Sequence, residues 1–92
     1  MEKFNFAMSV STARTTGEVL AVYFQIRKGA VAETREFADG KAFADYGHKG
    51  QLLGIELLGP CEFSILDKIA RKEPKAKRFL RRSIPREMAV AG

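Results

Sequence analysis

The sequence predicts an α+β fold, in which a single antiparallel β-meander of four to five strands is followed by one or two short C-terminal helices. Three observations predict it. Apolar and polar residues alternate at period two through much of the chain up to about residue 58. Turns that contain glycine separate the alternating segments. After Gly59-Pro60 the apolar spacing becomes helical, so the helices are expected to follow the sheet.

The central element is a hairpin over Ala42–Leu58. Two strands, Ala42–Tyr46 and Leu52–Leu58, flank a short turn. Gly47 and Gly50 in this turn supply the positive φ angles that a tight connection needs. Along the second strand we expect Leu53, Ile55 and Leu57 to share one face, and Leu52 and Leu58 to point away from it.

Three further strands are predicted upstream. Phe4–Val10 alternates at period two, and Glu18–Arg27 is rich in β-branched and aromatic residues. Val31–Phe37 is polar, which is typical of an edge strand. The second of these strands is apolar on both sides and is expected near the middle of the sheet. Its two faces carry Leu20, Val22, Phe24 and Ile26 on one side, and Val19, Ala21 and Tyr23 on the other.

Two short helices are predicted after the sheet. Ser64 with Asp67 resembles a capping box at the start of a helix over about Ser64–Lys72. Pro74 limits that helix and suits the first turn of a second one, which runs to about Ser83. Its apolar stripe is Ala76, Phe79 and Leu80. Residues 86–92 are predicted to be a loose tail, so residues 1–92 form one domain with a sheet at about 4–58 and helices at 64–83.

The composition is that of an ordinary globular protein. The chain has 92 residues, of which 46% are hydrophobic and 29% are charged. It shows no secretory signal and no apolar run long enough to cross a membrane. Cys61 is the only cysteine, so no internal disulfide can form. We therefore expect a cytoplasmic protein.

Positive charge is concentrated at the C-terminal end. The net charge is +5, but residues 1–66 contain seven Lys or Arg and eight Asp or Glu, which leaves −1. Residues 67–92 contain nine Lys or Arg and three Asp or Glu, which leaves +6. A basic patch on a neutral body attracts polyanions or acidic partners.

Four segments of the chain follow one another in an order that is typical of a known family: Ala21-Val22-Tyr23-Phe24, Val31-Ala32-Glu33-Thr34-Arg35-Glu36, Asp45-Tyr46 and Gly50-Gln51-Leu52-Leu53-Gly54-Ile55-Glu56. Together they resemble a small prokaryotic family known as domain of unknown function 2283. The resemblance covers about two thirds of the chain, from Phe4 to Ser64, and implies a compact sheet with a C-terminal helix and no assigned activity. Genes of this family sometimes neighbour toxin-like genes, which implies an antitoxin-like, protein-binding role in a prokaryote. Gly47, His48 and Lys49 depart from the acidic residues usual in the family at that point.

No catalytic constellation is found in the sequence. His48, the only histidine, has Asp45 nearby, but a general base also needs a nucleophile and a pocket, so a solvated turn residue is favoured. Cys61 is interpreted as a buried structural residue rather than a nucleophile. One histidine and one cysteine form no zinc motif, and the glycines match no nucleotide-binding motif. We therefore predict no enzyme activity, cofactor or metal.

The favoured function is a cytoplasmic interaction module with a protein partner. The two apolar sides of the second strand predict a homodimer with Tyr23 near its interface, unless the second helix covers the extra face. The alternative is a nucleic-acid-associated protein that uses the basic helix, because a row of cations can follow a phosphate backbone. The residues predicted to make that contact are Lys75, Lys77, Arg78, Arg81 and Arg82.

Overall fold

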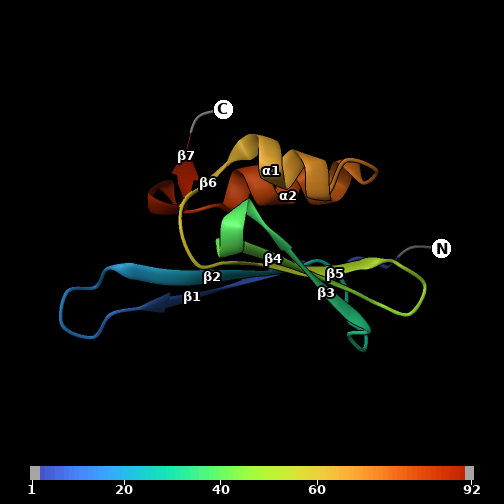
Figure 1. The fold of residues 1–92 in the computed structure, drawn as a ribbon, viewed down its shortest axis with the longest axis horizontal. Helices are drawn as coiled ribbons and strands as arrows, with labels where there is room; N and C mark the ends of the chain where they lie inside the picture. Colours follow the sequence, from blue (N-terminus) through green and yellow to red (C-terminus); the bar gives the residue numbers. More distant parts are fainter. Residues whose placement is uncertain (1–2, 91–92) are drawn as a thin grey trace.

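The computed structural model describes residues 3–90, in which a five-stranded antiparallel sheet is followed by two helices. Both helices lie on the same side of the sheet, so the protein has a strand layer and a helix layer (Figure 1). The predicted α+β class is confirmed. The strands are β1 (Ala7–Thr12), β2 (Val19–Gln25), β3 (Glu33–Phe37), β4 (Ala42–Tyr46) and β5 (Leu52–Leu57), and the helices are α1 (Phe63–Ile69) and α2 (Pro74–Ser83).

The strand order is β1-β2-β5-β4-β3. The hairpin of β1 and β2 therefore joins the β3-β4-β5 meander through the pairing of β2 with β5. This arrangement places β2 inside the sheet, as its apolar faces predicted, and β3 at an edge, as its polar residues predicted. Both edges of β2 are hydrogen-bonded, and its Val22 and Phe24 are buried in the core, whereas Leu20 is half exposed.

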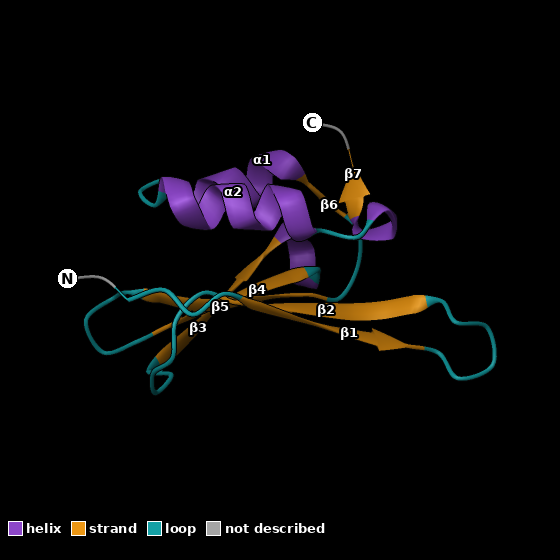
Figure 2. Ribbon diagram, turned by 180° about the vertical axis from the view of Figure 1, so that it is seen from behind, coloured by secondary structure: helices purple, strands orange, loops and turns teal. Residues whose placement is uncertain are grey.

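The core lies between the sheet and the helices. Val22 and Phe24 of β2 and Ile55 of β5 are fully buried beneath Leu66 of α1 and Leu80 of α2. Complete burial of each such side chain contributes roughly 1.5–3 kcal/mol to folding. The opposite face of the sheet is covered by neither helix (Figure 2). The second helix therefore does not cover the Tyr23 side of β2, which the sequence alone had left open.

Helix α2 has the predicted bounds and the predicted buried stripe. Pro74 occupies its first turn, where the missing N–H costs nothing, and the helix runs to Ser83. Ala76, Phe79 and Leu80 are buried against the sheet. The Phe79 ring meets the ring of Phe24 edge to face, with centroids 6.0 Å apart.

The start of α1 differs from the prediction. The helix begins at Phe63 after Glu62, and no side chain caps it. Ser64 lies inside the first turn and donates a hydrogen bond to the Glu62 carboxylate instead. Asp67 pairs with Arg81 of α2, so the capping box is wrong. The helix also ends at Ile69, three residues before the predicted limit at Lys72.

The segment that was predicted as a loose tail is ordered in residues 86–90. A short 3₁₀ turn, Arg86–Met88, leads into β7 (Ala89–Val90), which pairs in parallel with β6 (Cys61–Glu62). Met88 is 2% exposed and belongs to the core. The burial of Met88 explains why this segment is ordered although its sequence has no periodic signal. Residues 91–92 of the predicted tail lie outside the described residues.

The predicted assignment of β5 side chains to the two faces of the sheet is wrong at Leu52 and Leu53, because the register of β5 is irregular there. The pairing with β4 shifts between Asp45 and Tyr46, and the alternation along β5 changes at the same place. Leu52 therefore joins the core instead of pointing away from it. Leu53 leaves the face of Ile55 and packs against Gly29. Leu58 is half exposed, as expected.

Candidate functional site

The helix layer carries two separate rows of cations along α2. Spacing of three and four residues places Lys75, Arg78 and Arg82 on one side of the helix. All three are exposed, and none has a hydrogen bond or ion pair within residues 3–90. This row, Lys75–Arg78–Arg82, is called the α2 row below. It contains three of the five predicted nucleic-acid contacts.

The other two predicted contacts, Lys77 and Arg81, belong to the side of α2 that faces α1. Arg81 donates two hydrogen bonds to the Asp67 carboxylate, one of them from Nε at 3.1 Å. Its guanidinium also lies 5.2 Å from the centre of the Phe63 ring. The hydrogen bond from Arg81 lowers the pKa of Asp67 below its usual value. Arg81 therefore joins the two helices, and much of its charge is compensated.

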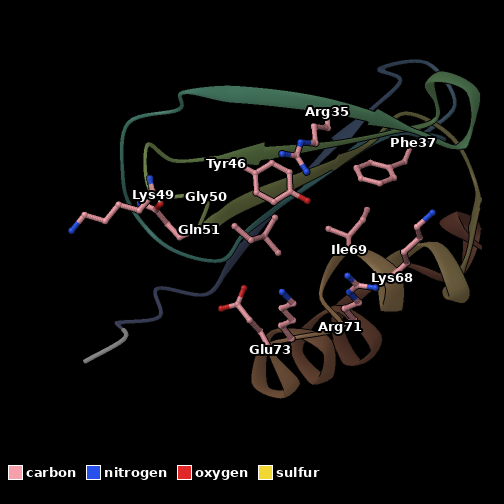
Figure 3. A pocket seen from close by; sticks show the side chains of 12 residues that line it. Arg35, Phe37, Tyr46, Lys49, Gly50, Gln51, Lys68, Ile69, Arg71 and Glu73 are labelled. Atoms are coloured by element: carbon pink, nitrogen blue, oxygen red, sulfur yellow. Dashed lines mark hydrogen bonds between the residues drawn. The ribbon is translucent and has the colours of Figure 1, made fainter.

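A cavity of about 550 Å³ lies between the sheet and the α1–α2 connection (Figure 3). Its walls come from four parts of the chain: β3, the end of β4, the β4–β5 turn with the start of β5, and the segment from Lys68 to Glu73. The wall is apolar at Phe37, Tyr46, Leu52 and Ile69. This cavity is called the edge pocket below. Its cationic rim consists of Lys49, Lys68, Arg71 and Lys72.

Arg35 and Tyr46 form a stacked pair in the edge pocket. The Arg35 guanidinium lies 4.8 Å from the centre of the Tyr46 ring. Arg35 also donates hydrogen bonds to the carboxylate of Glu33, one from Nε at 3.0 Å. This interaction holds the pKa of Glu33 below its usual range. The charge of Arg35 is thus compensated, and its flat guanidinium extends the aromatic surface.

Glu73, the carboxylate that lines the edge pocket, is bound to a buried arginine. Arg27 forms an ion pair with Glu73 and also donates a hydrogen bond to the Leu52 carbonyl at 2.7 Å. The side chain of Arg27 is only 8% exposed, so the pair joins the α1–α2 connection to the sheet from inside. Because Glu73 is neutralised in this way, it does not offset the cationic rim. Within residues 3–90 the four rim residues have no carboxylate partner of their own.

The β4–β5 turn positions Lys49 at the rim. The Gly47 N–H donates to the Gln51 carbonyl at 2.9 Å, and the Lys49 N–H donates to Gln51 Oε1 at 3.0 Å. A Cβ at Gly47 would lie 2.4 Å from Gln51 Nε2, so glycine leaves room for this side chain. His48 is exposed in the same turn. In the described part of the chain no hydrogen bond links His48 to Asp45, so the geometry gives no support to a histidine general base.

Asp45 lies on the open face of the sheet, in a small polar cluster. It accepts a hydrogen bond from Tyr23 Oη at 3.2 Å and another from Thr34 Oγ1 at 2.7 Å. The Tyr23 ring lies directly over Gly54, where an added Cβ would be 1.9 Å from the phenol oxygen. Burial, together with the nearby Asp45 carboxylate, raises the pKa of Tyr23 to about 12.

The open face is acidic, whereas the helix layer is basic. Cross-strand pairing places Glu36 opposite Phe43, and Phe43 opposite Glu56, so both carboxylates share the face of Asp45. Glu56 also pairs with Tyr23 across the β2–β5 ladder. The two layers therefore present opposite charge to opposite sides of the molecule.

The homodimer with Tyr23 near its interface stays a prediction. Tyr23 does lie on the face that neither helix covers. A two-fold pairing of these faces would, however, bring together carboxylates from both copies: Glu36, Asp45 and Glu56 in each. Like charges in contact oppose association unless cations intervene.

Cys61 lies in the core, as the structural interpretation predicted. It is 3% exposed, and burial raises the pKa of its thiol, which disfavours the thiolate form. Its Sγ lies 3.6 Å from the Gly59 carbonyl oxygen. Among residues 3–90, no group of three His, Cys, Asp or Glu side chains is placed to hold a metal ion.

Comparisons with protein-family models, with curated proteins and with solved structures found no match for this chain. The resemblance to domain of unknown function 2283 therefore stays an expectation. Neither α1 nor α2 is long and apolar enough to cross a membrane, and residues 3–90 contain no other candidate span.

Sequence reasoning identified the α2 row but missed the edge pocket. Of the rim residues, Lys68, Arg71 and Lys72 were visible as part of the basic segment, while Lys49 was seen only as a turn residue. The pocket depends on Tyr46 and Phe37 pointing toward the helices, which the register shift in β4 and β5 helps to decide. The sequence contains no clear signal for the pocket, because β3 is polar from Glu33 to Glu36 and its pattern does not predict which elements meet at its edge.

Proposed function

We propose that this protein binds nucleic acid, and that the cations of its helix layer contact the phosphate backbone. The observation that carries this proposal is a continuous set of cations without carboxylate partners in the described chain, on the side of the molecule opposite the acidic sheet face. Cations of this kind release counterions when they meet phosphates, which drives binding without sequence recognition. The set consists of Lys68, Arg71, Lys72, Lys75, Arg78 and Arg82 on the helix layer, together with Lys49 of the neighbouring β4–β5 turn.

The geometry of α2 suits a phosphate backbone. Lys75 and Arg82 are seven residues apart, which is roughly 10 Å along a helix that rises 1.5 Å per residue. The spacing of phosphates along one strand of a duplex is about 3.4 Å of axis. The α2 row therefore spans more than one phosphate of a strand.

A protein partner is the second candidate, and the open sheet face favours it. That face is uncovered by either helix and carries Glu36, Asp45 and Glu56, so it would suit a basic segment of another protein. The antitoxin-like role expected from the family resemblance belongs to this candidate. The helix layer supports nucleic acid more directly, because its cations are numerous and unpaired in the described chain.

The test is the binding of a fluorescent single-stranded DNA of about 20 nucleotides, measured by anisotropy. We expect binding at ~50 mM salt that weakens steeply toward ~200 mM. The double variant R78Q/R82Q removes two phosphate contacts and should flatten the slope of log affinity against log salt by about 1.4.

The matched control is R14Q/K41Q, which removes the same charge from exposed positions outside the helix layer. It should keep the salt slope of the parent protein. Absence of binding at ~50 mM salt would contradict the proposal, as would an equal loss in the two double variants, because that result would indicate net charge alone.

A further inference from the structure

We infer that the edge pocket holds one nucleoside phosphate, with the base against its aromatic wall and the phosphate at its cationic rim. The inference rests on the proposed function and deepens it, because it states which part of a nucleic acid enters the protein. The ligand is either a free nucleotide or one nucleotide of a single strand, and the experiment separates these sources.

The first step concerns the wall of the pocket. Phe37 and Tyr46 come from neighbouring strands, and the Arg35 guanidinium lies over the Tyr46 ring, 4.8 Å from its centre (Figure 3). Two aromatic rings and a planar guanidinium are a surface on which a base can stack. Inorganic phosphate or a sugar phosphate would make no use of it. A base inside a duplex is already stacked and cannot reach it.

The second step concerns charge. Arg35 is compensated by Glu33, and Glu73 is compensated by Arg27. The rim residues Lys49, Lys68, Arg71 and Lys72 therefore give the pocket a net positive charge of about four. An anion is the ligand that such a rim favours, since it gains charge-assisted hydrogen bonds. The combination of an anion with a flat apolar group is the chemistry of a nucleotide.

The third step concerns size and continuity. The cavity of about 550 Å³ falls in the usual range of roughly 300–1,000 Å³ for small-molecule pockets. Lys72 and Glu73 also line a second, smaller cavity of about 420 Å³, together with Phe4, Lys75 and Arg78. A strand with one base in the edge pocket can thus continue past Lys72 onto the α2 row.

The experiment uses isothermal titration calorimetry on the whole chain with five probes. They are adenosine monophosphate, adenosine, inorganic pyrophosphate, a single-stranded DNA of about ten nucleotides, and the corresponding duplex. We expect adenosine monophosphate to bind more tightly than adenosine or pyrophosphate, because only it fills both parts of the pocket. The single strand should bind at least about tenfold more tightly than the duplex.

Two double variants locate the site. K68Q/R71Q removes half of the rim charge and should weaken adenosine monophosphate about tenfold. R78Q/R82Q removes the same charge from the α2 row and should leave that affinity unchanged, while it weakens the single strand. Tyr46→Leu keeps an apolar side chain but removes the ring. It should weaken the affinity for adenosine monophosphate and for the single-stranded DNA about tenfold. Phe37→Leu repeats this test at the second ring if Tyr46→Leu fails to fold.

The outcomes separate the inference from the proposed function. If pyrophosphate binds as tightly as adenosine monophosphate, and duplex as tightly as single strand, the pocket inference is overturned while nucleic-acid binding stands. If adenosine monophosphate binds with the predicted variant effects but neither DNA binds, the pocket holds a free nucleotide and the proposed function is overturned. If no probe binds, both are overturned.

Discussion

Tyr23 shows how one contact on the open face links three strands. Its hydroxyl donates to Asp45 of β4, and its ring lies over Gly54 of β5. Any larger residue at 54 would collide with the ring, so glycine is required by space rather than by backbone angle. Thr34 of β3 donates to the same carboxylate. The cluster therefore holds the β3 edge to the centre of the sheet.

The raised pKa of Tyr23 predicts a loss of stability at high pH. The unfolded chain binds the phenol proton with a pKa of 10.0, and the folded protein binds it with a pKa of about 12. Folding favours the protonated phenol. The contribution of Tyr23 to the free energy of unfolding is therefore complete below pH 10 and is lost as the pH rises toward 12. Tyr23→Phe should lower the free energy of unfolding at neutral pH by about 1 kcal/mol and remove this part of the pH dependence.

The measurement is urea unfolding of both proteins between pH 8 and 12. The difference in unfolding free energy between the parent and Tyr23→Phe should shrink as the pH rises above 10. Tyr46→Phe is the control, because it removes the other tyrosine hydroxyl of the chain. The fall in unfolding free energy above pH 10 that depends on Tyr23 should persist in this variant. A difference that stays constant up to pH 12 would show that the Tyr23 hydroxyl does not titrate in the way described.

At this scale the sequence predicted the orientation of Tyr23 but not its partners. Tyr23 was predicted on the face opposite Val22 and Phe24, and it lies there. Asp45 was considered with His48, three residues away, yet its partners are Tyr23 and Thr34, which are 22 and 11 residues away. Contacts between strands depend on sheet order, and the order β1-β2-β5-β4-β3 has no local signature.

The α1–α2 hairpin is fixed to the sheet by the buried pair of Arg27 and Glu73. Arg27 follows β2 and reaches both the Leu52 carbonyl and Glu73, which directly precedes Pro74. The pair therefore sets where α2 begins relative to the sheet, and Glu73 lines the edge pocket. A charge at this depth is tolerated because the partner and the carbonyl replace the lost water.

Removing the carboxylate charge should loosen this attachment. Glu73→Gln removes a carboxylate that pairs with the buried Arg27 guanidinium, and we expect a loss of about 2 kcal/mol in the free energy of unfolding. Urea denaturation at neutral pH measures it. Glu87→Gln removes an equal charge from an exposed side chain and should change stability by less than about 0.5 kcal/mol. Equal values for the two variants would mean that the pair does not hold the hairpin.

The bounds of a helix were predicted correctly where residues within one turn of its ends determine them. Two prolines, Pro74 and Pro85, bound α2, and its bounds were correct because proline acts within one turn. The start of α1 was wrong because Ser64 had another partner within reach. The pairing of β6 with β7 was missed because two-residue strands have no period and join parts of the chain far apart in sequence.

At the scale of the whole molecule, the central feature is the separation of charge between two layers. Cations without carboxylate partners in residues 3–90 gather on the helix layer and the rim of the edge pocket, and carboxylates gather on the open sheet face. The uneven charge was visible in the sequence. The sign of each face was not, because it depends on which side of the sheet the helices cover.

The fold class was predictable, and the pocket was not, for the same physical reason. Periodicity is a property of neighbouring residues, and it specifies strands, helices and their apolar faces. The edge pocket is assembled from four separate segments, and its shape depends on how the α1–α2 connection meets the β3–β4 edge. The contact between these segments depends on side-chain packing in three dimensions, which cannot be inferred from a single sequence.

The most direct test of nucleic-acid binding by the helix layer is a titration followed by NMR. Backbone amide signals are recorded while a single-stranded DNA of about ten nucleotides is added at ~50 mM salt. The account predicts shifts in the residues of the α2 row, in the Lys68–Glu73 connection and around Tyr46 and Lys49, with the amides of β1 and the open-face residues Glu36 and Glu56 unmoved. Shifts confined to the open sheet face, or no shifts at all, would contradict it.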